Sequence, residues 1–212
     1  MDIALDNLLP HPFKNTEISS GVWGKKLLFK KGTKIHIKAP SASGKTTFIS
    51  MLYGLRRDYD GEILFNSKKT KALTPDEWAK VRQHQLSIVF QDLRLFENIT
   101  ALDNILIKAH LTGSDHEEKI HHLAKKCGIE AILDKKVAHL SRGEKQRIAI
   151  IRSLMQPFGW ILLDEPFSHL DKENRNKAVD IISLACEEQQ GGLILTSLEK
   201  DSYFSYQQKV SL

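Results

Sequence analysis

Short apolar runs alternate with helix-like segments along most of the chain. Runs that fit buried strands cover residues 35–39, 62–65, 86–90, 160–163 and 192–196. The run at 160–163 is continuously apolar, which is typical of a parallel strand buried on both faces. Helix-like segments cover 45–55 and 178–186, and apolar residues at helical spacing recur between 100 and 155.

The order of these elements predicts an α/β fold with a sheet of buried strands. The middle of the chain interrupts the alternation, because its apolar spacing is helical. We expect one domain over residues 1–212, with 1–90 and 156–212 as its strand-containing core and about 91–155 as a helical subdomain. A chain of 212 residues is long enough to bury a sizeable core.

Composition and charge exclude several classes of protein. The 31 Lys and Arg against 26 Asp and Glu give a net charge of +5, and the basic residues lie in scattered pairs. We therefore expect solvated surface charges and no nucleic-acid partner. The two cysteines, Cys127 and Cys186, exclude a disulfide scaffold and indicate a reducing compartment. No apolar run approaches the roughly 18 residues of a membrane helix, and no signal peptide is recognisable, so a soluble cytosolic chain is expected.

Residues 39–47 fit the pattern of a phosphate-binding loop between a strand and a helix. Such a loop turns backbone N–H groups inward and places a helix N-terminus behind them. Gly44 lets the backbone approach a phosphate, Lys45 is expected to neutralise the β- and γ-phosphate oxygens, and the Thr46 hydroxyl to bind Mg²⁺. The predicted nucleotide-binding residues of this loop are Ala39, Pro40, Ser41, Ala42, Ser43, Gly44, Lys45, Thr46 and Thr47. The alternative is a Ser-rich turn that only caps a helix.

A second pattern is the apolar run at 160–163 that ends in Asp164 and Glu165. Such a strand places Asp164 beside a metal ion and Glu165 where an attacking water needs a base. In isolation two carboxylates after a strand are more often a cap or surface charge. Downstream of a phosphate loop in one domain they predict a catalytic site.

A third pattern lies at residues 140–147. Ser141 and Glu144 have the spacing of a capping box that opens a helix. Gly143 exposes backbone N–H groups at the same helix start, so the segment is also a candidate anion site.

Taken in order, these segments resemble the nucleotide-binding subunit of an ABC (ATP-binding cassette) transporter. The phosphate loop is 39–47, the glutamine loop 90–92, the signature motif 140–144, the Walker B strand 161–165 and the D-loop 168–171. The resemblance covers nearly the whole chain, and the ordered set is more specific than any single motif. It implies the P-loop NTPase fold of an ABC-type ATPase, with ATP and Mg²⁺ as cofactors.

The resemblance also implies roles for individual residues. Thr46, Gln91 and Asp164 are the expected Mg²⁺ ligands, and Gln91 is expected to couple the site to a membrane partner. The signature contributes Ser141, Arg142, Gly143 and Glu144 to nucleotide binding. Of these, Ser141 and Gly143 are expected to contact the γ-phosphate of ATP held by a second copy of the chain, so ATP is expected to dimerise the protein.

Some positions depart from the family pattern. Arg142 stands where glycine is usual, and Ser197 stands in place of the switch histidine. We assign Ser197 and Glu165 to catalysis and expect slow basal hydrolysis, because serine reaches less far than histidine. His169 in the D-loop is a candidate for compensation, although a histidine on a surface loop is the simpler interpretation.

Two aromatic residues are candidates to stack on adenine. Phe13 lies at about the right distance upstream of the phosphate loop, and Trp23 is the alternative. Either side chain fits a core position equally well from the sequence alone.

The segment 86–105 resembles the ATPases of lipoprotein release, macrolide-type efflux and the cell-division pair. These ATPases pair with a separate integral membrane protein, so we expect a peripheral location on the inner face of the cell membrane. Residues 93–107 are the predicted docking face, with Leu95, Phe96 and Ile99 as its apolar residues. Core positions of the helical subdomain are the alternative for these side chains.

Two other functions remain open at this stage. One is a soluble ABC ATPase of DNA repair or translation, which usually carries long coiled-coil insertions or two cassettes. The other is a degenerate cassette that binds ATP as a switch with little turnover. Co-purification with a membrane protein would distinguish a transporter subunit from a soluble ABC ATPase. Single-turnover hydrolysis would distinguish a transporter subunit from a degenerate cassette.

Overall fold

The computed structural model describes residues 1–15, 19–40, 43–111, 113, 117–198 and 202–212. The strands are β1 (Ile3–Pro10), β2 (Lys26–Phe29), β3 (Lys34–Lys38), β4 (Tyr59–Phe65), β5 (Lys68–Lys69), β6 (Leu86–Val89), β7 (Trp160–Asp164), β8 (Gly192–Ser197) and β9 (Gln208–Ser211). The α-helices are α1 (Lys45–Leu52), α2 (Pro75–His84), α3 (Ala101–His110), α4 (Glu117–Lys126), α5 (Arg142–Ser153) and α6 (Lys172–Glu188). Short 3-10 helices cover His11–Phe13, Thr70–Ala72, Glu130–Ile132 and Val137–His139.

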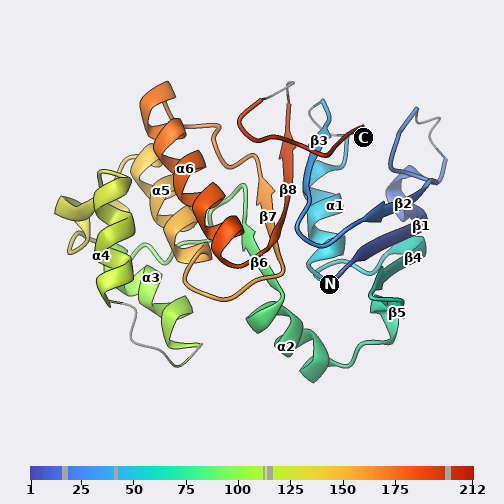
Figure 1. Cartoon of the computed structure of the whole chain (residues 1–212), viewed down its shortest axis with the longest axis horizontal. Helices are drawn as coiled ribbons and strands as arrows, with labels where there is room; N and C mark the ends of the chain where they lie inside the picture. Colours follow the sequence, from blue (N-terminus) through green and yellow to red (C-terminus); the bar gives the residue numbers. More distant parts are fainter. Residues whose placement is uncertain (16–18, 41–42, 112, 114–116, 199–201) are drawn as a thin grey trace.

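The strands form two sheets that lie on either side of helix α1 (Figure 1). The first sheet has the order β6-β7-β8-β3-β9, and every pair in it is parallel. The second has the order β2-β1-β4-β5 and is antiparallel. Since the carboxyl ends of parallel strands meet at one edge, the residues that follow β3, β6, β7 and β8 are brought to the same side of the molecule.

Helix α1 is buried between the two sheets. Its residues Phe48 and Leu52 belong to one apolar cluster with Ile37 and Leu162 of the parallel sheet and Ile63 of the antiparallel sheet. All five side chains are fully buried. This packing fixes the start of α1, and therefore the phosphate loop before it, against the end of β3.

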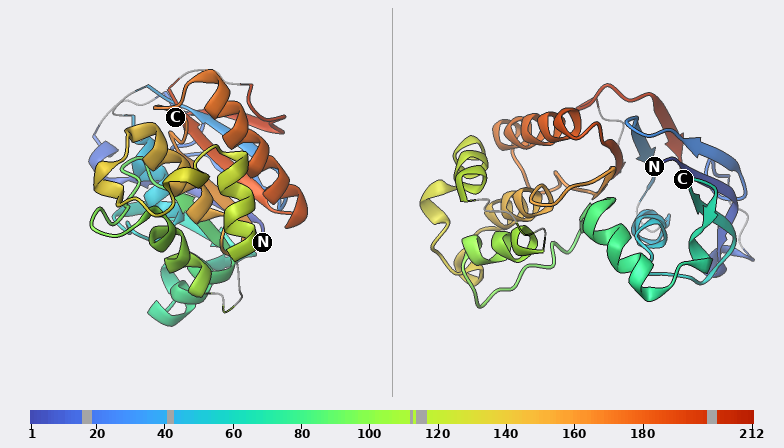
Figure 2. Two further views of the ribbon diagram at one scale, coloured as in Figure 1. Left: turned by 90° about the vertical axis from the view of Figure 1, so that its left-hand side faces the viewer. Right: turned by 60° about the horizontal axis from the view of Figure 1, so that its bottom comes forward.

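The helices α3, α4, α5 and α6 share a second apolar cluster with the opposite face of the parallel sheet (Figure 2). Leu163 and Leu195 project from the sheet into this cluster, where they join Ile105, Ile148 and Ile182 of three helices. Residues 91–155 are helical where they form regular structure, as the spacing predicts, and they share this core with the sheet. The division at about 91 and 155 into a core and a helical subdomain stays a prediction.

The α/β fold is confirmed, and the predicted strands all lie within observed strands or extend them by one residue. The helix predicted over 45–55 ends earlier, at Leu52, because Gly54 takes a positive φ of 73°. The sequence analysis missed the strands β1, β2, β5 and β9 and the helix α2. Strand β9 lies at the edge of the parallel sheet, and every second residue in it is exposed. The apolar pattern of β1 is interrupted by the polar residues Asp6 and Asn7. No helix formed by the described residues is long and apolar enough to cross a membrane.

Candidate functional site

Gly44 begins helix α1 and cannot be replaced without strain. It has a φ of 96°, which L side chains rarely adopt. A Cβ built on Gly44 would lie 2.7 Å from Cε2 of Phe13, so the ring of Phe13 lies directly against the phosphate loop. Ser41 and Ala42, which were also predicted to bind nucleotide, lie outside the described residues.

Lys45 is buried, and its ammonium group is held by three oxygens. The Nζ atom donates to the carbonyl oxygens of Ala39 and Pro40, each at 2.9 Å. It also lies 3.2 Å from Oε1 of Glu165, whose side chain is only 13% exposed. The predicted phosphate-binding cation and the predicted base therefore form an ion pair.

Three predicted metal ligands come together from three elements. The Thr46 hydroxyl donates to Oε1 of Gln91 at 3.1 Å, and Thr196 donates to Asp164 at 2.7 Å. Burial raises the pKa of Asp164, and hydrogen bonds from Thr196 and Thr46 act in the opposite direction. A hydroxyl, an amide oxygen and a carboxylate are oxygen donors of the type that Mg²⁺ prefers, so this set fits a magnesium ion.

Glu165 follows β7 in a backbone conformation that is uncommon for a side-chain residue, with a φ of 49°. Its N–H donates to the carbonyl of Thr196 at 3.2 Å. The side-chain amide of Gln146, on α5, donates to the carbonyl oxygens of Glu165 and Pro166. The turn that presents the predicted base is therefore fixed from two sides, by β8 and by α5.

A cavity of about 270 Å³ joins these residues. It is lined by Phe13, Gly44, Lys45, Thr46, Thr47, Gln91 and Glu165. The other candidate aromatic, Trp23, is 5% exposed and packs between Phe13 and Phe48, with ring centroids 6.0 and 5.9 Å away. Of the two aromatic residues, Phe13 is the one that lies at the cavity.

The segment after Gln91 is anchored to helix α5. Leu93 and Arg94 both have positive φ values, of 60° and 47°. Arg152 of α5 donates to their carbonyl oxygens at 2.6 and 2.7 Å, and burial lowers the pKa of Arg152 to about 10. These contacts connect the Gln91 loop to the same helix that begins at the signature motif.

The predicted capping box at the start of α5 is confirmed. Ser141 is the N-cap residue, its Oγ accepts from the N–H of Glu144, and the Glu144 carboxylate accepts from the N–H of Ser141 at 2.8 Å. Hydrogen bonds from Ser141 lower the pKa of Glu144. A Cβ on Gly143 would lie 3.0 Å from the carbonyl oxygen of His169, so the D-loop packs closely against the start of α5.

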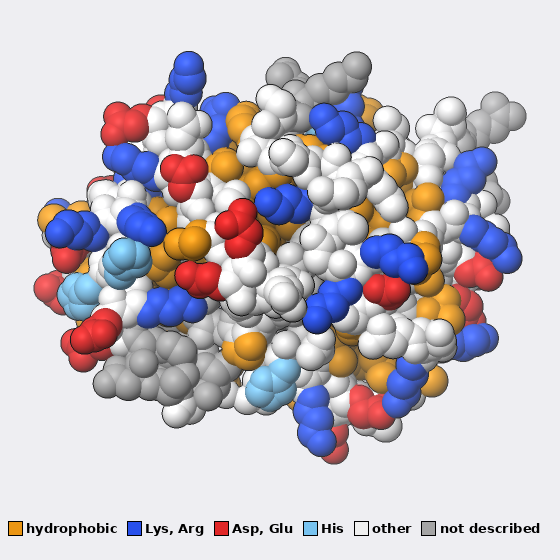
Figure 3. All heavy atoms as spheres, viewed as in Figure 1, with side chains coloured by type: hydrophobic (Ala, Val, Ile, Leu, Met, Phe, Trp, Pro, Cys, Tyr) orange, Lys and Arg blue, Asp and Glu red, His pale blue; other side chains and the backbone are white. Residues whose placement is uncertain are grey.

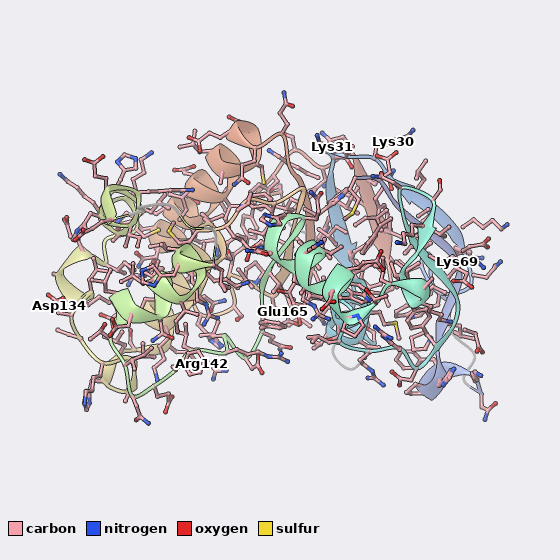
Figure 4. The ribbon with its side chains drawn as sticks, turned by 90° about the horizontal axis from the view of Figure 1, so that it is seen from below. Lys30, Lys31, Lys69, Asp134, Arg142 and Glu165 are labelled. Carbon is pink, nitrogen blue, oxygen red and sulfur yellow. The ribbon has the colours of Figure 1, made fainter. Side chains whose placement is uncertain are left out.

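The signature residues are not among those that line the cavity at the phosphate loop. Ser141 and Arg142 are exposed, and Arg142 lines a separate cavity together with Gln91. Figure 4 shows Arg142 on the helical side of the molecule, apart from Glu165. Within one copy of the chain, therefore, the signature motif and the phosphate loop do not form one site.

Ser197 ends β8 beside Glu165, and both residues line a further cavity of about 360 Å³. The Oγ atom of Ser197 lies 2.7 Å from Nε2 of His36, a buried residue of β3. The other histidine considered from the sequence, His169, is exposed on the D-loop, as the simpler interpretation predicts.

Sequence reasoning missed His36 and Gln146. His36 was part of a predicted strand but had no role, although a histidine between Ile35 and Ile37 is an unusual polar residue on a buried strand. Gln146 lies within the third pattern but was not singled out. A glutamine on the buried face of a helix is a signal of the same kind, because buried amides need partners.

A phosphate loop before a buried helix, with two carboxylates after a parallel strand, defines a nucleotide-binding P-loop ATPase. The sequence pattern of the family described as ABC transporter matches residues 24–168. The chain belongs to the ABC transporter family, as an ATP-binding ATPase domain, and the predicted resemblance is confirmed.

Individual relatives agree with this assignment. The thiamine import ATP-binding protein ThiQ of Yersinia pestis is 33% identical over 179 residues, which cover 82% of this chain and 73% of ThiQ. The lipoprotein-releasing system ATP-binding protein LolD of Buchnera aphidicola is 35% identical over 159 residues, which cover 74% of this chain and 69% of LolD. LolD belongs to one of the groups named from the sequence, whereas thiamine import was not anticipated.

Among solved structures, a dimeric structure of the bacterial ABC transporter cassette MJ0796 matches with a TM-score of 0.78. It is 28% identical, and the match covers 92% of this chain and 87% of that cassette. A second structure of MJ0796 is described as a dimeric post-hydrolysis state bound to ADP and Pi, with the same score and coverage. The similarity supports the P-loop ABC ATPase fold.

Proposed function

We propose that this chain binds and hydrolyses ATP, dimerises around it, and powers a separate membrane-embedded transport or force-transmitting partner. The observation that carries the proposal is the cavity that brings Lys45, Thr46, Gln91 and Glu165 together at the carboxyl edge of the parallel sheet. The ring of Phe13 at the same cavity is the proposed surface for adenine.

Each residue has a proposed task in the reaction. Lys45 leaves Glu165 for the β- and γ-phosphate oxygens, which are stronger anionic partners than a single carboxylate. Glu165, released from this ion pair, accepts the proton of the attacking water. Ser197 is the proposed second catalytic residue, as a donor beside Glu165. Thr46, Gln91 and Asp164 hold Mg²⁺, which neutralises charge on the phosphate oxygens when bound.

Residues 39–47 supply the remaining nucleotide contacts in the proposal. The start of α1 is an anion site because its backbone N–H groups have no helical acceptors and its dipole favours negative charge. Ser43 and Thr47 lie at this helix start, and the Ser43 hydroxyl is held by the Pro40 carbonyl at 2.7 Å.

Dimerisation follows from the position of the signature motif. Ser141 and Gly143 lie at the exposed start of α5, away from the phosphate loop of their own chain. A second copy can supply this helix start, with Arg142 and Glu144, to the γ-phosphate. The dimeric MJ0796 structures support an arrangement of this kind.

A membrane partner is proposed to dock on the segment after Gln91. Phe96 is 58% exposed, which is unusual for a large aromatic side chain, and Ile107 and Leu111 are also exposed. The proposed location is therefore the inner face of the cell membrane, where this partner holds the chain. On the face seen in Figure 3, basic and acidic side chains are interspersed, which fits solvated charge better than a nucleic-acid surface.

Nucleotide titration tests the proposed function. Lys45→Ala is expected to weaken ATP binding at least tenfold, about 1.4 kcal/mol, because the triphosphate loses its main side-chain cation. Lys69→Ala, at an exposed lysine far from the cavity (Figure 4), is the control and should bind like the wild type. An unchanged affinity of Lys45→Ala would reject the phosphate-loop assignment.

A further inference from the structure

We propose that Gln146 is a positioning residue for ATP hydrolysis, which holds the turn that carries Glu165 against helix α5 and so sets the direction of the base. This inference rests on the proposed hydrolytic function. It assigns a task to a residue of α5 that lies beyond the proposed nucleotide contacts of the signature motif.

The hydrogen bonds of the Gln146 side chain go to the backbone of this turn. Its Nε2 atom donates to the carbonyl oxygen of Glu165 at 3.3 Å and to that of Pro166 at 2.5 Å. Because both partners are acceptors, the amide presents its NH2 group to them. Gln146 is 1% exposed, so the surrounding side chains fix its rotamer. One buried amide therefore holds two successive carbonyl groups of the turn.

The turn at Glu165 needs such support because of its backbone conformation. Glu165 has a φ of 49°, a sparsely populated conformation that persists only where the surrounding structure maintains it. On one side, the N–H of Glu165 donates to the carbonyl oxygen of Thr196 on β8 at 3.2 Å. Gln146 holds the other side, at the carbonyl group. The two contacts together set the direction in which the Glu165 side chain leaves the backbone.

That direction decides where the carboxylate lies. The Oε1 atom of Glu165 is 3.2 Å from Nζ of Lys45, and Glu165 lines the cavity at the phosphate loop together with Lys45 and Thr46. Gln146 is not among the residues that line this cavity, so it acts through Glu165. A general base must lie within hydrogen-bond reach of the water that it deprotonates, so a small rotation of the turn is enough to misplace it.

Helix α5 connects the base to the signature motif. Ser141 is the N-cap residue of α5, and Gln146 lies in the next turn of the same helix. The start of α5 also packs against the D-loop that follows the Glu165 turn, since a Cβ on Gly143 would lie 3.0 Å from the carbonyl oxygen of His169. In the proposal, the nucleotide of a second copy binds at the start of the helix that holds the base.

The alternative is a purely structural amide that satisfies two carbonyl groups and has no effect on the direction of the base. The chain contains a matched residue that separates the two roles. Gln156 is 3% exposed, and its Nε2 atom donates to the carbonyl oxygens of Arg82 and Leu86, each at 2.9 Å. It makes the same kind of hydrogen bonds as Gln146 but is not among the residues that line the cavity of Lys45.

The test compares the full-length wild type with Gln146→Met and Gln156→Met in thermal unfolding and in kcat and KM for ATP. Methionine is similar to glutamine in size but cannot donate, so both variants should have a lower Tm. Gln146→Met is expected to lower kcat by about tenfold with KM unchanged, because the base is misdirected while the nucleotide contacts remain. Gln156→Met should keep the wild-type kcat at temperatures at which it is folded.

Two further variants separate the direction of the base from closure of the dimer. Gln146→His keeps an N–H group that can donate, so it should retain more activity than Gln146→Met. In the Glu165→Gln background, Gln146→Met should still dimerise with ATP and Mg²⁺, because the amide does not contact the nucleotide in the proposal. Gln146→Ala, which removes the amide and adds no bulk, replaces Gln146→Met if the latter does not fold.

The outcomes are distinct. Equal losses of kcat in Gln146→Met and Gln156→Met, a loss confined to KM, or failure of the double variant to dimerise would overturn the positioning role. An unchanged kcat in Gln146→Met would overturn it as well. A wild-type protein that binds ATP but shows no hydrolysis sensitive to Glu165→Gln would instead reject the proposed function itself.

Discussion

At the scale of single residues, the motifs predict the site well and miss what supports it. Lys45, Thr46, Gln91 and Glu165 line one cavity, as their order along the chain indicates. The ion pair of Lys45 with Glu165 was not predictable, because it joins residues that a motif treats separately. The partner of Ser197 was also missed, since a contact between β3 and β8 depends on their register and not on spacing in the sequence.

Gly44→Ala tests the geometry of the phosphate loop. The substitution should lower the free energy of unfolding by about 1–3 kcal/mol and weaken ATP binding. The reasons are that Gly44 has a positive φ, which alanine rarely adopts, and that the added methyl group would clash with the ring of Phe13. Gly24→Ala is the matched control: Gly24 has a φ of 68° but nothing within 4 Å of a Cβ. Denaturant unfolding and nucleotide titration give both quantities. Equal losses in the two variants would show that the contact with Phe13 contributes nothing.

At the scale of elements, apolar periodicity predicts the buried strands of the parallel sheet and most of the helices, but of the antiparallel sheet it predicts only β4. In the parallel sheet, the strands β3, β6, β7 and β8 are buried along most of their length, whereas β9 is half-exposed and polar. The predicted docking segment is divided by its packing: Leu93 and Ile105 are buried, whereas Phe96 projects outward. Periodicity alone cannot separate these cases, because core and docking residues share the same spacing.

A buried asparagine on α3 holds the Phe96 segment in place. Asn104 is fully buried, accepts from the N–H of Phe96 at 2.8 Å, and donates to the carbonyl oxygens of Phe96 and Thr100, each at 2.9 Å. These bonds fix the loop in front of the helix so that the Phe96 ring faces outward. The loop and α3 therefore behave as one element.

Phe96→Asp and Asn104→Ala should separate docking from folding. Phe96→Asp is expected to change the free energy of unfolding by less than about 0.5 kcal/mol and to weaken recruitment to membranes that carry the partner. Asn104→Ala should lower the free energy of unfolding by about 1–3 kcal/mol, because it leaves buried backbone groups unsatisfied. Thermal unfolding and membrane co-sedimentation measure the two effects. Unfolding of Phe96→Asp would favour a core role for this residue.

At the scale of the whole molecule, the phosphate loop and the signature motif lie at separate places in the single chain. The phosphate loop, the carboxylates and Phe13 surround one cavity, and the signature motif opens α5 elsewhere on the surface. The sequence predicts this division only through the family resemblance, because the distance between two loops in the folded chain cannot be read from spacing. Helix α5, which begins at the signature motif, packs on the same parallel sheet that carries β7.

The most direct test of the account is the association state of Glu165→Gln with ATP and Mg²⁺, measured by light scattering. The amide keeps the shape of the side chain but cannot accept the proton of water, so the closed state should accumulate. The account predicts a dimer at saturating ATP and a monomer without nucleotide, and Lys45→Ala should remain monomeric under both conditions. A Glu165→Gln protein that binds ATP and stays monomeric would contradict the central claim that two copies close around the nucleotide.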